Sequence, residues 1–145
     1  MADPSNAAPP PRAQPETLRG RALSASLTVA DLTKSLAWYR DVVGFVVDRE
    51  HERDGRKVAV SLKGGAVSIL LTQDDGKKGR DRVKGQGFSL QITTAQDIDQ
   101  LAARIRERGG ALELEPMTTN WRARIFRVVD PDGFRLTFSS ERPGG

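Results

Sequence analysis

The chain carries one motif twice. Residues 26–45 read as a strand, a helix and the start of another strand, and residues 89–111 repeat that order about 66 residues later. When the two copies are aligned, Asp31 at the start of the first helix matches Asp97 at the start of the second. A repeat of fixed period indicates two copies of one supersecondary unit, so it constrains the architecture before any single residue does.

Hydrophobic periodicity divides each copy into elements. In the first copy it predicts a strand over 22–29, a helix capped by Asp31 and ended by Gly44, and strands over about 45–52, 56–62 and 66–73. In the second it predicts a strand from Phe88, a helix ended by Gly109 and Gly110, and strands over about 111–115, 121–129 and 133–139. The first strand has one apolar face, predicted to comprise Leu23, Ala25, Leu27 and Val29.

These elements predict an α+β fold of two β-α-β-β-β modules, 22–73 and 86–140, within one domain over 21–140. Each module has one helix, so the second face of its sheet must meet the other module or enclose a cavity. That second face is polar in three strands: Ser24, Ser26 and Thr28; Ser89, Gln91 and Thr93; Arg135, Thr137 and Ser139. A polar-lined concave surface is favoured over ordinary solvent-facing alternation, because Lys and Glu are sparse there.

Composition limits what the domain can do. Residues 1–20 hold five of the eight prolines and little apolar bulk, so they are predicted to be a disordered tail, with a second short tail at 141–145. The chain has no cysteine, which excludes disulfides, thiolate catalysis and Cys-ligated zinc. No stretch is long enough to span a membrane, and a cytoplasmic protein is expected.

Charge gives a weaker signal. The net charge is +4, but most basic residues alternate with acidic ones, so nucleic-acid binding is not favoured. The exception is the basic segment 77–84, which has five cations in eight residues. It is predicted to be a solvated linker between modules, and the alternative is an anion-binding flap over a pocket.

Two motifs resemble those of the vicinal oxygen chelate superfamily, which covers glyoxalase I, bleomycin-resistance proteins and extradiol dioxygenases. One is Trp38-Tyr-Arg-Asp-Val-Val-Gly-Phe45 after Val29-Ala-Asp-Leu32, and the other is Asp130-Pro-Asp-Gly-Phe-Arg-Leu-Thr137. The resemblance spans roughly residues 22–140. It implies a U-shaped mixed sheet of paired modules, often completed by a second copy, and a divalent metal in the trough.

The metal ligands that the resemblance implies are missing from this sequence. Where the family has two histidine ligands, this sequence has Ser24 and Ser89. It has Thr137 in place of the family's glutamate ligand, and Leu71 at the position of a fourth ligand that some members use. Hydroxyls and an alkyl group cannot supply the imidazole and carboxylate donors that Zn²⁺, Ni²⁺ or Fe²⁺ require. We therefore expect neither a metal nor another cofactor.

Other catalytic chemistry has little support. His51, the only histidine, lies in a charged strand end and is interpreted as a surface residue. Glu113 and Glu115 alternate with leucines and are predicted to share one face, either as a solvated edge or as an acid or base in the trough. Trp121 is predicted to open a strand, where it would stack on a planar ligand or make a rim contact.

The sequence thus predicts a metal-independent binding protein for a small organic molecule, such as a natural product or drug, that forms a homodimer. The predicted ligand-binding residues line the trough: Ser24, Ser26, Leu71, Ser89, Gln91, Trp121, Arg135 and Thr137. Whether the chain is an enzyme stays open. The alternatives are a metal-dependent lyase, isomerase or dioxygenase of the same fold, and a basic protein that binds a partner through 77–84.

Overall fold

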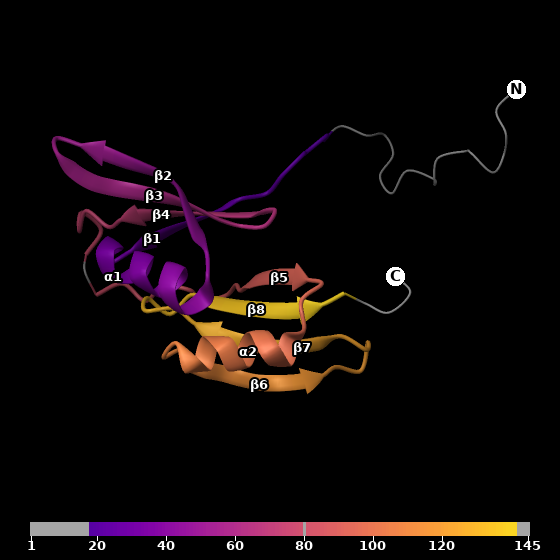
Figure 1. Cartoon of the computed structure of the whole chain (residues 1–145). Coiled ribbons are helices and arrows are strands. Elements are labelled where there is room, and N and C mark those ends of the chain that lie inside the picture. The colour runs from indigo at the N-terminus through magenta and orange to yellow at the C-terminus, as the bar shows by residue number, and fades with distance from the viewer. Residues whose placement is uncertain (1–17, 80, 142–145) are drawn as a thin grey trace, which may run out of the picture.

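Each half of the chain folds as a strand, a helical segment and three further strands (Figure 1). The computed structural model describes residues 18–79 and 81–141, so the predicted tails lie outside the described part except for 18–20 and 141. The first half holds β1 (Ala25–Val29), α1 (Leu32–Ala37), the π-helical segment η2 (Trp38–Val43), β2 (Val46–Arg53), β3 (Arg56–Gly64) and β4 (Val67–Gln73). The second half holds β5 (Leu90–Thr94), α2 (Ile98–Glu107), β6 (Leu112–Thr118), β7 (Arg124–Val129) and β8 (Arg135–Ser140).

The strands form two four-stranded mixed sheets. Sheet A has the order β1-β4-β3-β2 and sheet B the order β5-β8-β7-β6. In each sheet the first strand runs parallel to the last strand of its module, and the other pairings are antiparallel. The predicted α+β fold with two β-α-β-β-β modules is confirmed, and each module keeps its own hydrogen-bonded sheet.

Both helical segments begin at an aspartate. Asp31 Oδ1 accepts a hydrogen bond from the amide of Lys34 at 3.1 Å, and Asp97 Oδ1 accepts one from the amide of Gln100 at 2.9 Å. Each carboxylate satisfies a first-turn amide that has no partner within the helix. At the other end, Gly44 closes η2 with a φ of 110°, a left-handed conformation in which glycine has no Cβ penalty.

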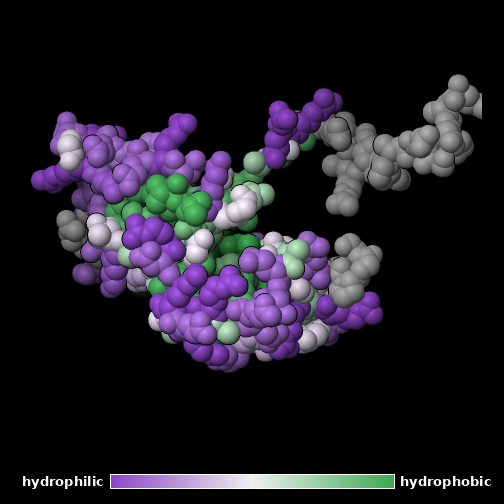
Figure 2. All heavy atoms as spheres, in the orientation of Figure 1, coloured by the Kyte–Doolittle hydropathy of each residue, from purple (hydrophilic) through white to green (hydrophobic). Residues whose placement is uncertain are grey.

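One hydrophobic core joins the two modules. Alternate residues of the strands point into it, such as Leu27 and Val29 of β1 and Phe126 and Val128 of β7, and they pack with the apolar faces of α1, η2 and α2. Figure 2 shows hydrophobic surface where the two halves meet, within a largely hydrophilic exterior. The predicted apolar face is wrong at Leu23, which precedes β1 and is 96% exposed, because pairing with β4 starts only at Ala25.

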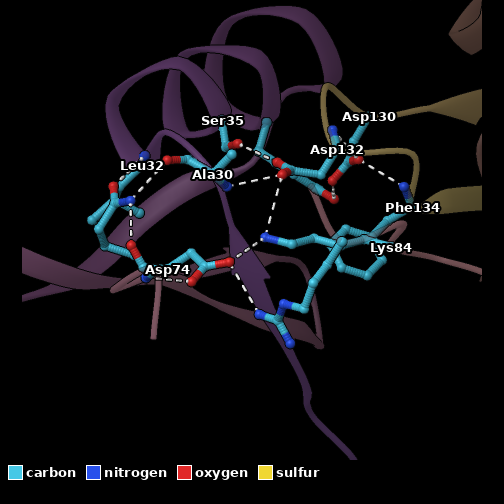
Figure 3. Close-up of polar contacts among 12 residues, drawn as sticks. Ala30, Leu32, Ser35, Asp74, Lys84, Asp130, Asp132 and Phe134 are labelled. Carbon is cyan, nitrogen blue, oxygen red and sulfur yellow. Dashed lines mark hydrogen bonds and ion pairs between the residues drawn. The ribbon is translucent and has the colours of Figure 1, made fainter. Parts of the chain in front are cut away.

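A polar cluster, here called the clasp (Ser35, Tyr39, Asp130 and Asp132), ties the first helical segment to the turn between β7 and β8 (Figure 3). Tyr39 Oη donates to Asp130 Oδ2 at 2.7 Å, and Ser35 Oγ donates to Asp132 Oδ2 at 3.2 Å. The amide of Ala30 donates to Asp132 Oδ1 at 2.8 Å. Burial raises the pKa of both the Tyr39 phenol and the Asp130 carboxyl. The clasp therefore fixes one module against the other through buried, fully partnered polar groups.

The basic segment 77–84 is anchored beside the clasp. Arg82 Nη2 and Lys84 Nζ each lie 3.0 Å from Asp74 Oδ2, and Lys84 Nζ lies 3.7 Å from Asp132 Oδ1. Hydrogen bonds from the Gly76 amide, Lys84 and Arg82 lower the pKa of Asp74. Two of the segment's cations are thus engaged in fixing it to the domain, which favours the linker interpretation.

Within the described residues, neither the length nor the hydropathy of any helix suits it to crossing a membrane.

Candidate functional site

A cleft of about 480 Å³ lies between the edges of the two sheets, where β1 and the start of β4 approach β5. It is lined by residues 23–27, 66–69 and 88–92. Four predicted ligand-binding residues line this cleft: Ser24, Ser26, Ser89 and Gln91. The repeat places them there because β1 and β5 are the matching first strands of the two modules.

Two further predicted residues, Arg135 and Thr137, lie beside the cleft on the helix-free face of sheet B. Their strand neighbours Leu136 and Phe138 belong to the core, so the alternate side chains of β8 point to the opposite face. In the strand register Gln91 pairs with Thr137, which places these two residues side by side on this face. Six of the eight predicted residues therefore lie at the cleft or on the adjoining face.

The prediction for Leu71 is wrong. Leu71 is fully buried, pairs with Leu27 across β1 and β4, and belongs to the hydrophobic core. Its neighbour Leu70 is half-buried and pairs with Ser26, on the helix-free face of sheet A. The predicted position is one residue away from the one that faces the trough, and a shift of one residue along a strand moves a side chain to the other face of the sheet. A run of three aliphatic residues, 69–71, gives no alternation from which to read that phase.

Trp121 does not open a strand, contrary to the prediction, and its stacking or rim contact stays a prediction. Trp121 lies in the turn before β7, is 51% exposed and lines neither of the described cavities. The turn is closed by hydrogen bonds between Thr119 and Ala123, in which the Thr119 amide donates to the Ala123 carbonyl at 2.8 Å and the Ala123 amide donates to Thr119 Oγ1 at 3.1 Å. These local bonds delay the start of the strand to Arg124.

Glu113 and Glu115 do not share a face, contrary to the prediction. The pairing of β6 with β7 shifts register twice, between Leu112 and Leu114 and again before Met117. Such irregularities break the two-residue alternation. Glu113 accepts hydrogen bonds from Arg135 on the helix-free face, whereas Glu115 forms an ion pair with Arg106 of α2.

Sequence reasoning missed Arg127, which lies at the centre of the helix-free face of sheet B. It alternates with the core residues Phe126 and Val128 of β7, and its Nε donates to Thr137 Oγ1 at 2.9 Å. Its Nη1 lies 3.8 Å from Glu113 Oε1, beyond hydrogen-bond distance, whereas Arg135 Nε donates to that oxygen at 2.9 Å. The alternation of polar and apolar residues within 124–129 could have found it, because it places Arg127 on the face of the strand opposite to Phe126 and Val128.

His51 lies on the helix-free face of sheet A. Its Nε2 is 3.5 Å from Ser61 Oγ, and the ring is exposed, as the surface interpretation expected. Arg49 pairs with Ser61 in the same register, so the two β2 side chains lie on one face. Among the residues that the structure describes, no carboxylate or cationic group hydrogen-bonds to this ring.

Comparison with known proteins gives the family. The Glyoxalase/Bleomycin resistance protein/Dioxygenase superfamily model matches residues 21–138. The chain belongs to this superfamily. A probable lactoylglutathione lyase of Vibrio cholerae is 31% identical over 123 residues, covering 80% of this chain and 87% of that protein. A probable lactoylglutathione lyase of Synechocystis is 29% identical over 120 residues, covering 79% and 90%.

A solved structure of a Glyoxalase/bleomycin resistance protein/dioxygenase superfamily member from Sphaerobacter thermophilus has the same fold. Its TM-score with this chain is 0.69 at 24% identity, and the match covers 85% of this chain and 98% of that one.

The residues at the superfamily's implied metal positions do not fit a divalent cation. Ser24, Ser89 and Thr137 offer neutral hydroxyls, and Thr137 already accepts a hydrogen bond from the Arg127 guanidinium. A positive group at that distance opposes a second cation. Across 18–79 and 81–141, no three His, Cys, Asp or Glu side chains gather closely enough to hold a metal ion.

A second cavity, of about 330 Å³, lies between the modules on the side of the helices. Its walls come from residues 43–45, 64–67 and 92–96 together with Leu101, Phe138 and Glu141. None of the predicted ligand-binding residues lines it.

Proposed function

We propose that the chain is a metal-independent member of the superfamily that binds a small organic ligand, a natural product or a drug-like molecule. The observation that carries this proposal is the chemistry of three positions. Ser24, Ser89 and Thr137 stand where the family resemblance implies two histidines and a glutamate. Hydroxyls are weak neutral ligands for a divalent metal, but they orient small molecules well through hydrogen bonds.

The cleft supplies the contacts that such a ligand needs. Its lining combines hydroxyl and amide groups of Ser24, Ser26, Ser89 and Gln91 with apolar side chains that include Leu23 and Phe88. Pockets of a few hundred Å³ with mostly apolar walls and a few placed polar groups are typical of small-molecule sites. Arg135 and Thr137 extend the polar part of the site onto the face of sheet B.

The proposal includes a homodimer. Ser89, Gln91 and Arg135 are exposed in a single chain, and so are the apolar side chains of Leu23 and Phe88 at the cleft. A second copy packed over the helix-free faces would turn an open surface into an enclosed trough and bury these side chains.

The test is elemental analysis of protein purified without chelator, followed by a thermal-shift screen of a small-molecule library. We expect less than stoichiometric metal, no rise in melting temperature with Zn²⁺, Ni²⁺ or Mn²⁺, and a rise with at least one organic ligand. Near-stoichiometric metal, or a large metal-dependent rise abolished by Ser24→Ala, would overturn the proposal.

A lyase acting with a divalent metal is the second candidate. The observation in its favour is the identity of up to 31% with proteins named probable lactoylglutathione lyase. This candidate predicts metal-dependent interconversion of lactoylglutathione and its cleavage products, assayed in both directions. Absence of turnover with each metal in the presence of folded protein would leave the binding function as the better account.

A further inference from the structure

The Arg127 guanidinium is held in place by one hydrogen bond, and its other N–H donors have no acceptor among the described residues. One donor, Nε–H, is engaged by Thr137 Oγ1 at 2.9 Å, and Thr137 itself is only 5% exposed. Nη1 lies 3.8 Å from Glu113, beyond hydrogen-bond distance. Within the described residues, neither Nη1 nor Nη2 donates a hydrogen bond, and the side chain is 34% exposed. The group is therefore fixed in orientation while its forked outer edge remains available.

Glu113 does not neutralise this face. Its carboxylate accepts from Arg135 Nε at 2.9 and 3.2 Å, so its close contacts are with Arg135 and not with Arg127. One carboxylate beside two guanidiniums leaves a net positive charge at the centre of the helix-free face of sheet B. The helix-free face of sheet A also carries cations, since Arg49 pairs with Ser61 and Lys63 pairs with Ser68.

The polar row around Arg127 leads to the cleft. Gln91 lines the cleft and pairs with Thr137, and Thr137 pairs with Arg127 on the next strand. Adjacent strands lie about 5 Å apart, so Arg127 is two spacings, about 10 Å, from Gln91. A carboxylate on two fused rings and the reach of the arginine side chain together cover that distance. The guanidinium stands beside Thr137, the position at which the resemblance implied an anionic metal ligand.

We infer that Arg127 anchors the ligand through a carboxylate or comparable oxyanion, so that a fixed guanidinium supplies the positive charge that a divalent metal supplies elsewhere in the superfamily. This inference rests on the proposed ligand-binding function and narrows it to anionic organic ligands. The planar fork of arginine binds a carboxylate with two parallel hydrogen bonds, which gives orientation as well as affinity. Thr137 is the positioning residue, because its hydroxyl holds Nε and turns Nη1 and Nη2 outward.

The test uses a matched pair of probes, 2-naphthoate and 2-naphthamide, which have nearly the same shape and differ in charge. Their dissociation constants are measured by calorimetry on the full chain at low salt. We expect the unmodified protein to bind the carboxylate about tenfold more tightly than the amide, the size of one charge-assisted hydrogen bond. Arg127→Gln should remove that preference, and Arg127→Lys should keep part of it.

Two other variants test the assignment. Arg124→Gln alters the same strand, but that guanidinium is paired with Asp99 at 2.7 Å, so the preference should stay unchanged. Glu113→Gln removes the carboxylate between the two guanidiniums and should tighten naphthoate binding several-fold. The double variant Glu113→Gln/Arg127→Gln separates Arg127 from Arg135, because it should lose that gain only if Arg127 binds the carboxylate.

Equal affinity of the unmodified protein for the two probes would overturn the inference and leave the proposed binding function standing. A preference that survives Arg127→Gln in folded protein would overturn it as well. If neither probe binds, the inference fails, and the metal analysis and library screen still decide the proposed function. If Arg127→Gln does not fold, Arg127→Lys carries the test, and an undiminished preference in that variant would overturn the inference.

Discussion

At the scale of single residues, the buried bond between Tyr39 and Asp130 is a sensitive point of the molecule. Tyr39 is fully buried, and its hydroxyl is the partner of Asp130 Oδ2, while Oδ1 accepts from the amides of Asp132 and Phe134. Burial raises the pKa of Asp130, and the hydrogen bond from Tyr39 counteracts that rise. A buried carboxylate oxygen that loses its donor is costly, more so than the bond was favourable.

Tyr39→Phe should therefore lower the free energy of unfolding by about 1–3 kcal/mol, because Asp130 Oδ2 loses its donor while the aromatic ring keeps its packing. Urea denaturation measures the difference. Ser35→Ala, which removes a longer bond of 3.2 Å to Asp132, is the control and should cost less. Equal stability of Tyr39→Phe and the unmodified protein would contradict the role given to this bond.

Asp74 links stability to pH in the acid range. The Gly76 amide, Lys84 and Arg82 lower its pKa in the folded state, so the folded protein binds a proton there less readily than the unfolded chain. The stabilisation is then present above the unfolded pKa of about 3.9 and is lost as pH falls through the lower folded value. Asp130, whose pKa is raised, contributes with the opposite sign.

We expect the melting temperature to fall as pH drops below about 4, and Asp74→Asn to make that fall shallower, because the variant has no carboxyl to protonate. Melting curves between mildly acidic and strongly acidic pH measure the two slopes. Parallel slopes for Asp74→Asn and the unmodified protein would show that other carboxyls govern the acid transition.

At the scale of elements, alternation predicts where strands lie better than which face each residue occupies. Asp31 and Gly44 mark the ends of the first helical segment as predicted, and the polar faces of β1, β5 and β8 follow the predicted alternation. Leu71 was assigned to the wrong face because residues 69–71 are all aliphatic, so no alternation of polar and apolar residues shows which of them point into the core. Glu115 was misplaced because a register shift in β6 depends on pairing with β7, a tertiary contact that the local sequence does not contain.

The phase of β4 can be tested with neighbouring leucines. Leu71→Ala should cost about 2–5 kcal/mol of unfolding free energy, since Leu71 is fully buried in the core. Leu70→Ala removes the same atoms from a half-buried position on the helix-free face and should cost clearly less. Chemical denaturation of both variants is the measurement. A larger loss for Leu70→Ala would reverse the assignment of faces.

At the scale of the whole molecule, the core and the clasp hold the two modules together on the side of the helices. Residues 18–79 and 81–141 of one chain place no element over the helix-free faces. Leu23 is 96% exposed, Phe88 is 47% exposed, and both line the cleft between the sheet edges. Unpaired strand edges beside exposed apolar side chains favour association with another chain. In the proposed dimer, a second copy would close over Arg127, Arg135 and the cleft and enclose them in a common interior.

The full chain should therefore be a dimer, with a mass by light scattering of twice 15.9 kDa at tens of micromolar. Replacing both Leu23 and Phe88 by glutamate should shift it to the monomer, because charged side chains resist burial in the interface. Val83→Glu is the control, since Val83 is 72% exposed in the basic segment, away from the cleft lining. A monomeric unmodified protein at this concentration would mean that ligand binding takes place on an open face, and naphthoate should then bind without any dependence on protein concentration.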